Sequence, residues 1–106
     1  MLQYNKCQMW YNFTTLVSYS TTVAFIQYGA AYLWRYPSAT TTRHISNFRK
    51  LSARSEVSTM FYPLIDSARR NKWEYAKAYF DENGVFWVIE ISRNEFFDNA
   101  ARVTIS

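Results

Sequence analysis

Alternating large and small side chains mark the first third of the chain. Between residues 13 and 27, the odd positions up to Phe25 carry Phe, Tyr, Val or Thr, whereas the even positions are mostly Ser, Thr and Ala. A period of two is typical of β-strands, so we expect one long strand, or two strands with a bulge near residues 20–22. Gly29 permits a turn, and residues 31–36 are predicted to form a return strand that ends at Pro37. The N-terminal third is therefore predicted to be a β-ribbon.

The spacing of apolar residues becomes helical after residue 37. Residues 38–42 read Ser-Ala-Thr-Thr-Thr and offer several N-caps, of which we favour Thr40 or Thr41. Apolar side chains then fall on one side of a helix, which predicts a first helix over residues 41–54. These apolar residues are Ile45, Phe48 and Leu51.

A second helix is predicted over residues 56–71, because six apolar residues between 57 and 68 recur at the spacing of one helix face. Ser55 would cap this helix, and Glu56 would suit the positive end of its dipole. Pro63 leaves two alternatives open. Either the helix is kinked there, because proline removes a backbone donor, or it begins at Pro63 as its first residue.

The final third returns to a period of two. Residues 75–91 are predicted to form a hairpin, because Asn83-Gly84 separates two runs of aromatic and β-branched residues. Residues 94–99 resemble a short helical turn whose Phe96 and Phe97 would cover an open face of the sheet, and residues 103–105 would add a last strand. The predicted fold is α+β, a single domain over residues 1–106 with a mostly antiparallel sheet and two central helices on one face.

Charge is distributed unevenly along the chain. Every Asp and Glu lies at or beyond Glu56, so the first 55 residues contain no acidic side chain. The first segment carries six basic residues, and the remainder carries six basic and eight acidic residues, so charges of +6 and −2 give the chain its net charge of +4. This asymmetry predicts an electropositive face and an anionic partner. The basic residues of the acid-free segment are Lys6, Arg35, Arg43, Arg49, Lys50 and Arg54.

Basic and amide side chains form a narrow stripe on the predicted first helix, opposite its apolar side. The aromatic residues on either side of Arg35 would stack on unpaired bases if the partner were nucleic acid. Arg43 and His44 emerge at the start of the helix, a place that tolerates anions. The candidate binding residues are therefore Trp34, Arg35, Tyr36, Arg43, His44, Asn47, Lys50 and Arg54.

Catalytic and metal chemistry have little support in the sequence. The chain contains one histidine, one cysteine and no glycine-rich loop, so we expect no enzyme and no cofactor. Structural zinc needs four ligands, which one Cys and one His do not supply. His44 is expected to be a packed side chain that is hydrogen-bonded to backbone. An enzyme would become plausible only if Cys7 and His44 met in a cleft.

The longest apolar runs are six residues each, whereas a membrane-spanning helix needs roughly 18 or more. The first residues lack the pattern of a secretory signal. We therefore expect no membrane association and a cytoplasmic protein. Cys7 is the only cysteine, so an internal disulfide is not expected.

One segment resembles a known group of proteins. Residues 19–26, Tyr-Ser-Thr-Thr-Val-Ala-Phe-Ile, and residues 34–45, Trp-Arg-Tyr-Pro-Ser-Ala-Thr-Thr-Thr-Arg-His-Ile, are similar to small uncharacterised proteins of bacteriophages and mobile elements. In that group, an aromatic strand leads into a Ser-x-Thr-Thr-x-(Arg or Lys)-His-Ile sequence. The resemblance implies an origin on a phage, prophage or plasmid, and it assigns no activity to any residue.

These patterns lead to two hypotheses. The first is a non-enzymatic binding protein of phage or mobile-element origin that inhibits a host protein with an acidic surface, in the manner of anti-defence or anti-CRISPR inhibitors, within the host bacterium. The alternative is a small single-stranded DNA- or RNA-binding accessory protein that uses the same basic and aromatic residues. Exposed sheet edges would also allow a homo-oligomer.

Overall fold

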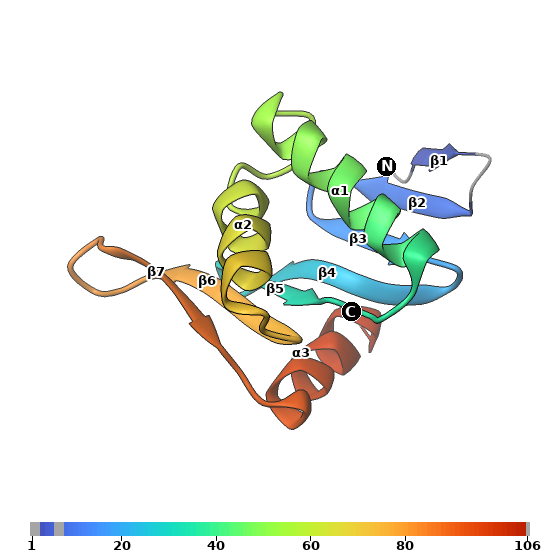
Figure 1. Ribbon diagram of the computed structural model, residues 1–106. Helices are drawn as coiled ribbons and strands as arrows, with labels where there is room; N and C mark the ends of the chain where they lie inside the picture. The colour runs from blue at the N-terminus through green and yellow to red at the C-terminus, as the bar shows by residue number, and fades with distance from the viewer. Residues whose placement is uncertain (1–2, 6–7, 106) are drawn as a thin grey trace.

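Figure 1 shows the computed structural model of the chain, which describes residues 3–5 and 8–105. The described strands form one antiparallel sheet whose order follows the chain from β1 to β7. The strands are β1 (Gln3–Asn5), β2 (Met9–Asn12), β3 (Thr15–Ser18), β4 (Thr21–Gln27), β5 (Ala30–Trp34), β6 (Tyr75–Phe80) and β7 (Phe86–Glu90). The helices are α1 (Ala39–Ala53), α2 (Phe61–Asn71) and α3 (Arg93–Ile105).

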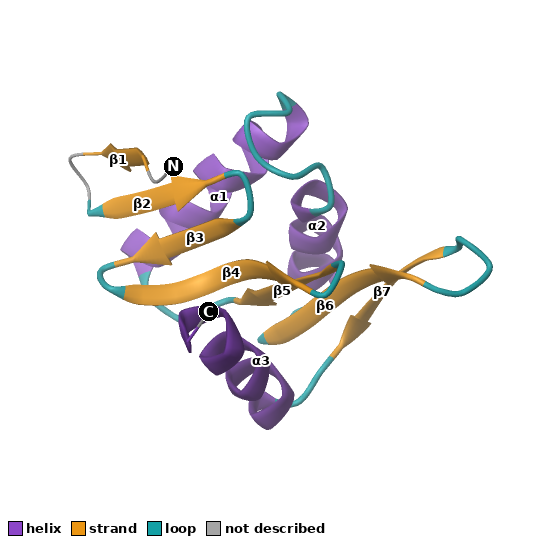
Figure 2. Cartoon of the chain, turned by 180° about the vertical axis from the view of Figure 1, so that it is seen from behind, coloured by secondary structure: helices purple, strands orange, loops and turns teal. Residues whose placement is uncertain are grey.

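Helices cover both faces of the sheet, with α1 and α2 on one face and α3 on the other (Figures 1 and 2). The predicted α+β fold with a mostly antiparallel sheet is therefore confirmed, whereas the prediction of two helices on one face is incomplete, because α3 covers the other face. Each face has its own hydrophobic core. Leu33, Phe48 and Leu64 lie in the core beneath α1 and α2. Phe25 and Phe96 lie in the core beneath α3.

Two-residue turns connect β2 to β3, β3 to β4 and β4 to β5. Tyr19 and Ser20 both have positive φ angles, of 51° and 69°, and join β3 directly to β4. This pair of left-handed residues is the geometry of a type I′ hairpin turn. The alternative of one long strand is therefore wrong, because a turn separates β3 from β4. The register shift falls between Leu16 and Val17, opposite Thr22 and Ala24, just after the expected bulge at residues 20–22. Gly29 lies in the β4–β5 turn, with a φ of +78°.

Helix α1 begins at Ala39, two residues before the predicted start. The N-cap is Ser38, whose Oγ accepts a hydrogen bond of 3.0 Å from the backbone N–H of Thr41. The expectation of Thr40 or Thr41 as the cap is wrong. Thr41 is buried instead, and its Oγ1 lies 3.0 Å from the hydroxyl of Ser18 on β3. The side chain of Thr41, which the sequence suggested as a cap, instead forms a hydrogen bond to the sheet.

Helix α2 begins at Phe61 and not at residue 56, and Ser55 does not cap it. The first turn is held from α1, because Ser52 Oγ accepts a 2.9 Å hydrogen bond from the N–H of Tyr62 and donates to the carbonyl oxygen of Ser58. Pro63 is the third residue of α2, so it lies in the first turn, where a missing backbone N–H costs no helical bond. No helical turn precedes Pro63, so neither predicted alternative describes it.

The predicted hairpin over residues 75–91 is confirmed by the pairing of β6 with β7. The carboxylate of Asp81 organises its loop, since Oδ1 accepts hydrogen bonds from the N–H groups of Asn83 and Val85. The last predicted strand is wrong, because α3 continues to Ile105. Phe96 lies in the second core, and Ala100 and Val103 pack against it at helical spacing, so one face of a helix places all three against the sheet.

Candidate functional site

The predicted basic stripe of α1 faces solvent. Arg43, Asn47, Lys50 and Arg54 are all exposed in the structure. Arg54 forms an ion pair of 3.2 Å with Glu56, and both side chains are largely in water, so the pair contributes little. Arg43 and Lys50 lie within 4 Å of no carboxylate among the residues that the structure describes. These two cations are therefore available to a partner.

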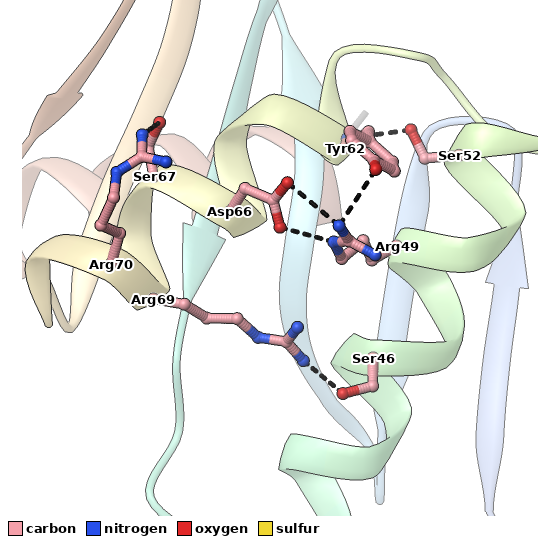
Figure 3. Close-up of polar contacts among 8 residues, drawn as sticks. All are labelled: Ser46, Arg49, Ser52, Tyr62, Asp66, Ser67, Arg69 and Arg70. Atoms are coloured by element: carbon pink, nitrogen blue, oxygen red, sulfur yellow. Dashed lines mark hydrogen bonds and ion pairs between the residues drawn. The ribbon is translucent and has the colours of Figure 1, made fainter.

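Arg49 is not part of the stripe, because it joins α1 to α2 (Figure 3). Its Nε and Nη2 donate to Oδ1 and Oδ2 of Asp66 at 2.5 and 3.1 Å, and Nη2 also donates to the hydroxyl of Tyr62 at 3.0 Å. The guanidinium carbon lies 4.2 Å from the centre of the Tyr62 ring. The hydrogen bond from Arg49 lowers the pKa of Asp66. This two-pronged contact neutralises one cation of the acid-free segment.

A second link between the two helices runs from Arg69 on α2 to the hydroxyl of Ser46 on α1 (Figure 3). Arg70 points along the same helix, where Nη2 donates to Ser67 Oγ. Arg69 and Arg70 both lie in the last turn of α2. The packing of α2 beside α1 brings them into the same layer as the α1 stripe.

Arg35 is turned inward and does not join the stripe. Its Nη1 donates to the carbonyl oxygens of Ala68 and Trp73 at 3.3 and 3.0 Å. These carbonyls lie at the C-terminal end of α2, where the helix dipole favours a cation. Arg35 therefore stabilises the end of a helix that begins 26 residues after it in the sequence.

The aromatic neighbours of Arg35 have different environments. Trp34 stacks on Tyr75, with ring centroids 5.8 Å apart, and meets Phe97 edge to face at 5.1 Å. Its indole N–H donates to Oε2 of Glu74. Trp34 is therefore part of the packing beneath α3, so the expected platform for unpaired bases lacks this ring. Tyr36 remains 42% exposed.

His44 is buried, with 2% of its surface exposed. Its Nδ1 lies 2.8 Å from the hydroxyl oxygen of Ser18, so a side chain of β3 is one of its partners. The packed role is the observed one, and His44 is not on the binding surface. Lys6 and Cys7 lie outside the described residues, so the structure does not test whether Cys7 meets His44.

The asymmetry of charge along the sequence becomes an asymmetry in space. The segment from residue 35 to residue 74, which we call the α1–α2 layer, carries eight basic and three acidic side chains, a net charge of +5. The segment from residue 75 to residue 105, with β6, β7 and α3, carries three basic and five acidic side chains, a net charge of −2. The α1–α2 layer is therefore the candidate binding surface.

Other kinds of site find no support in the described part of the chain. It contains no cluster of three or more His, Cys, Asp or Glu side chains suited to a metal ion. Within residues 3–5 and 8–105, no helix combines the length and hydropathy needed to cross a bilayer.

Comparison with known proteins gives one match. Residues 3–63 match a family described as a family of unknown function (DUF8033). The matched part runs from β1 through α1 to the first turn of α2, so it includes the basic stripe and His44. No curated protein and no solved structure matches the chain.

Proposed function

We propose that this chain, which belongs to the DUF8033 family, is a non-enzymatic binding protein that engages an acidic surface of another protein through its α1–α2 layer. The observation that carries the proposal is the separation of charge, +5 in that layer against −2 in β6, β7 and α3. Such a dipolar distribution orients a protein as it approaches an anionic partner and speeds the encounter. The positive charge of the layer thus favours a partner with a negatively charged surface and favours docking through the α1–α2 layer.

The stripe supplies two cations, Arg43 and Lys50, that form no ion pair within the described residues. Arg43 and Lys50 project from the outer side of α1, which the two buried residues Ile45 and Phe48 hold against the sheet. A rigid helix presents such side chains at fixed spacing, so the backbone loses little conformational entropy on binding. Tyr62, at the N-terminal end of α2, and Tyr36, before α1, add exposed aromatic surface of the kind that anchors protein interfaces.

The distribution of side chains favours a protein partner over a nucleic acid. Trp34 is packed against Tyr75 and Phe97, so of the two rings that flank Arg35, Tyr36 alone is exposed for stacking on a base. Glu56, Asp66 and Glu74 also lie in the layer. Interspersed acids oppose a continuous phosphate backbone, whereas they suit a protein surface that carries both signs of charge.

Binding to single-stranded DNA or RNA is the second candidate function. The net charge of +5 in one layer favours it, because phosphate contacts need no specific aromatic residue. The two candidates differ in their dependence on salt, since release of counterions from nucleic acid makes that binding fall steeply as salt rises.

The biological setting belongs to the same proposal. The similarity of residues 19–26 and 34–45 to small phage and mobile-element proteins supports an origin on such an element. A protein of this origin that binds without catalysis would act by occluding a host protein in the bacterial cytoplasm, with components of defence systems as the class of target.

Affinity capture with matched charge reversals tests the proposal. Lys50→Glu removes a cation from the α1 stripe, whereas Arg102→Glu makes the same change in net charge on α3. From nuclease-treated host lysate, the original chain and Arg102→Glu should retain one host protein in stoichiometric amount, and Lys50→Glu should lose it. Recovery of nucleic acid from untreated lysate without any such protein would contradict the proposal. Retardation of single-stranded probes that weakens steeply with salt would then support the second candidate.

A further inference from the structure

We infer that a hollow between the start of α1 and the C-terminal end of α2 binds the phosphate group of a small ligand. The hollow has a volume of about 290 Å³ and is lined by residues from the β5–α1 connection, both helices and the α2–β6 connection. It lies apart from Lys50 and Arg54 of the stripe. The inference therefore goes beyond the proposed function and does not rest on it.

Three cations line this hollow, and each comes from a different position in the fold. Arg35 follows β5, Arg69 lies in the last turn of α2, and Lys72 is the C-cap of that helix in a left-handed conformation with a φ of 58°. The one lining carboxylate is Glu74, which already accepts a hydrogen bond from the Trp34 indole. The side chains of the lining thus carry a net charge of +2, which outweighs the partial negative charge of about 0.5 at the C-terminal end of α2 and attracts the dianion of a phosphate monoester.

The two arginines are held in place before any ligand arrives. Arg35 is half-buried, and its Nη1 is fixed by the carbonyl oxygens of Ala68 and Trp73. Nε and Nη2 of Arg35 form no hydrogen bond within the described residues. Arg69 is half-buried too and is steadied by Ser46. Guanidinium groups that are already positioned bind a phosphate with less loss of side-chain entropy.

The other walls indicate the size of the ligand. Tyr36 and Pro37 form one side and Ile45 contributes a buried apolar surface. A hollow of about 290 Å³ is at the lower limit of pockets that hold small molecules. The aromatic ring of Tyr36 offers a stacking surface beside the cations. A nucleoside monophosphate combines one phosphate group with one planar base. Free phosphate carries the same group that the cations would bind.

Thermal unfolding of the full chain, with the ionic strength held constant by sodium chloride, tests this inference. Inorganic phosphate and adenosine monophosphate at millimolar concentration should each raise the Tm, whereas adenosine should not, because a ligand that binds only the folded state stabilises it. A larger rise with the monophosphate than with phosphate would identify the nucleotide as the source of the group. Equal rises would identify free phosphate.

Two neighbouring arginines provide matched variants. Arg69→Gln removes a lining cation and should weaken phosphate binding by about 10-fold or more, as loss of a charged hydrogen bond does. Arg70→Gln makes the same change one residue away, outside the hollow, and should retain the affinity. Lys72 is exposed and, unlike Arg69, does not link α2 to α1. Lys72→Gln therefore tests the hollow even if Arg69→Gln fails to fold.

The inference is overturned if phosphate raises the Tm no more than chloride of equal ionic strength does. It is also overturned if Arg70→Gln weakens binding as much as Arg69→Gln and Lys72→Gln. Lys50→Glu should leave phosphate binding within about twofold, because long-range charge effects are screened at moderate salt. A failure of this inference would therefore leave the proposed function of the stripe standing.

Discussion

The hydroxyl oxygen of Ser18 on β3 lies 2.8 Å from Nδ1 of His44 on α1, and both side chains are 2% exposed. Thr41 Oγ1, one turn earlier on α1, lies 3.0 Å from the same hydroxyl. These three polar groups form a buried cluster between the sheet and the helix. The cluster fixes the position of α1 on β3 and removes His44 from the surface, which leaves Arg43 as the exposed member of the Arg-His pair.

Replacement of Ser18 by Ala should lower the free energy of unfolding by about 1–3 kcal/mol, because the buried partners at His44 and Thr41 lose the hydroxyl that they share. Urea denaturation followed by tryptophan fluorescence measures the loss. Ser67→Ala is the control, since that hydroxyl contacts only the exposed Arg70 and should change stability by no more than about 0.5 kcal/mol. Equal effects of the two substitutions would show that the cluster adds no specific stability.

The N-cap of α1 is open to a direct comparison of Ser38 with Thr40. Ser38→Ala should destabilise the protein by about 0.5–2 kcal/mol, because the N–H of Thr41 loses its acceptor. Thr40→Ala should cost less or even stabilise, since Thr40 lies inside the helix and Ala has the higher helix propensity. The free energy of unfolding of both variants decides between the two residues. A greater loss for Thr40→Ala than for Ser38→Ala would show that Ser38 is not the N-cap.

Stability at acid pH should depend on the contact between Asp66 and Arg49. The hydrogen bond from Arg49 lowers the pKa of Asp66 in the folded state below its value in the unfolded chain. The resulting stabilisation is complete above the unfolded pKa, about 3.9 for Asp, and is lost as pH falls through the folded pKa. Asp66→Asn should therefore flatten the acid limb of a plot of unfolding free energy against pH.

Arg49→Gln removes the other partner and should flatten the same limb. The double variant should lose less than the sum of the two single losses, because the two residues contact each other. Additive losses, or an acid limb unchanged in Asp66→Asn, would contradict a stabilising pair.

Helix α3 should depend on one aromatic side chain. Phe96 is fully buried and packs against Phe25, Trp34 and Tyr75. Phe96→Ala should cost about 3–5 kcal/mol, the usual loss for deletion of a buried ring. Phe80, which is 57% exposed in the hairpin, is the matched control, and its replacement by Ala should cost much less. Guanidinium denaturation compares the two, and a small loss for Phe96→Ala would mean that α3 is dispensable.

Short-range patterns predicted the parts of the fold that local geometry controls. The β6–β7 hairpin followed from Asn83-Gly84, where Gly84 has a φ of +79°, and the two central helices followed from their apolar spacing. The starts of those helices were misplaced because contacts from elsewhere in the chain fix them. Ser52 of α1 holds the first turn of α2, and Ser18 of β3 engages Thr41. The helical turn predicted over residues 94–99 was too short, because Ala100 and Val103 also pack against the second core and α3 continues to Ile105.

The sign and the order of charge can be read directly from the sequence, because the acid-free segment and its basic residues are visible there. The strand and helix periods can be read there too, because side-chain direction follows the backbone repeat. Which cations remain for a partner depends on tertiary packing. Arg49 pairs with Asp66, 17 residues away, and Arg35 binds the carbonyl of Trp73, 38 residues away. Such contacts depend on how elements pack, so no local pattern reports them.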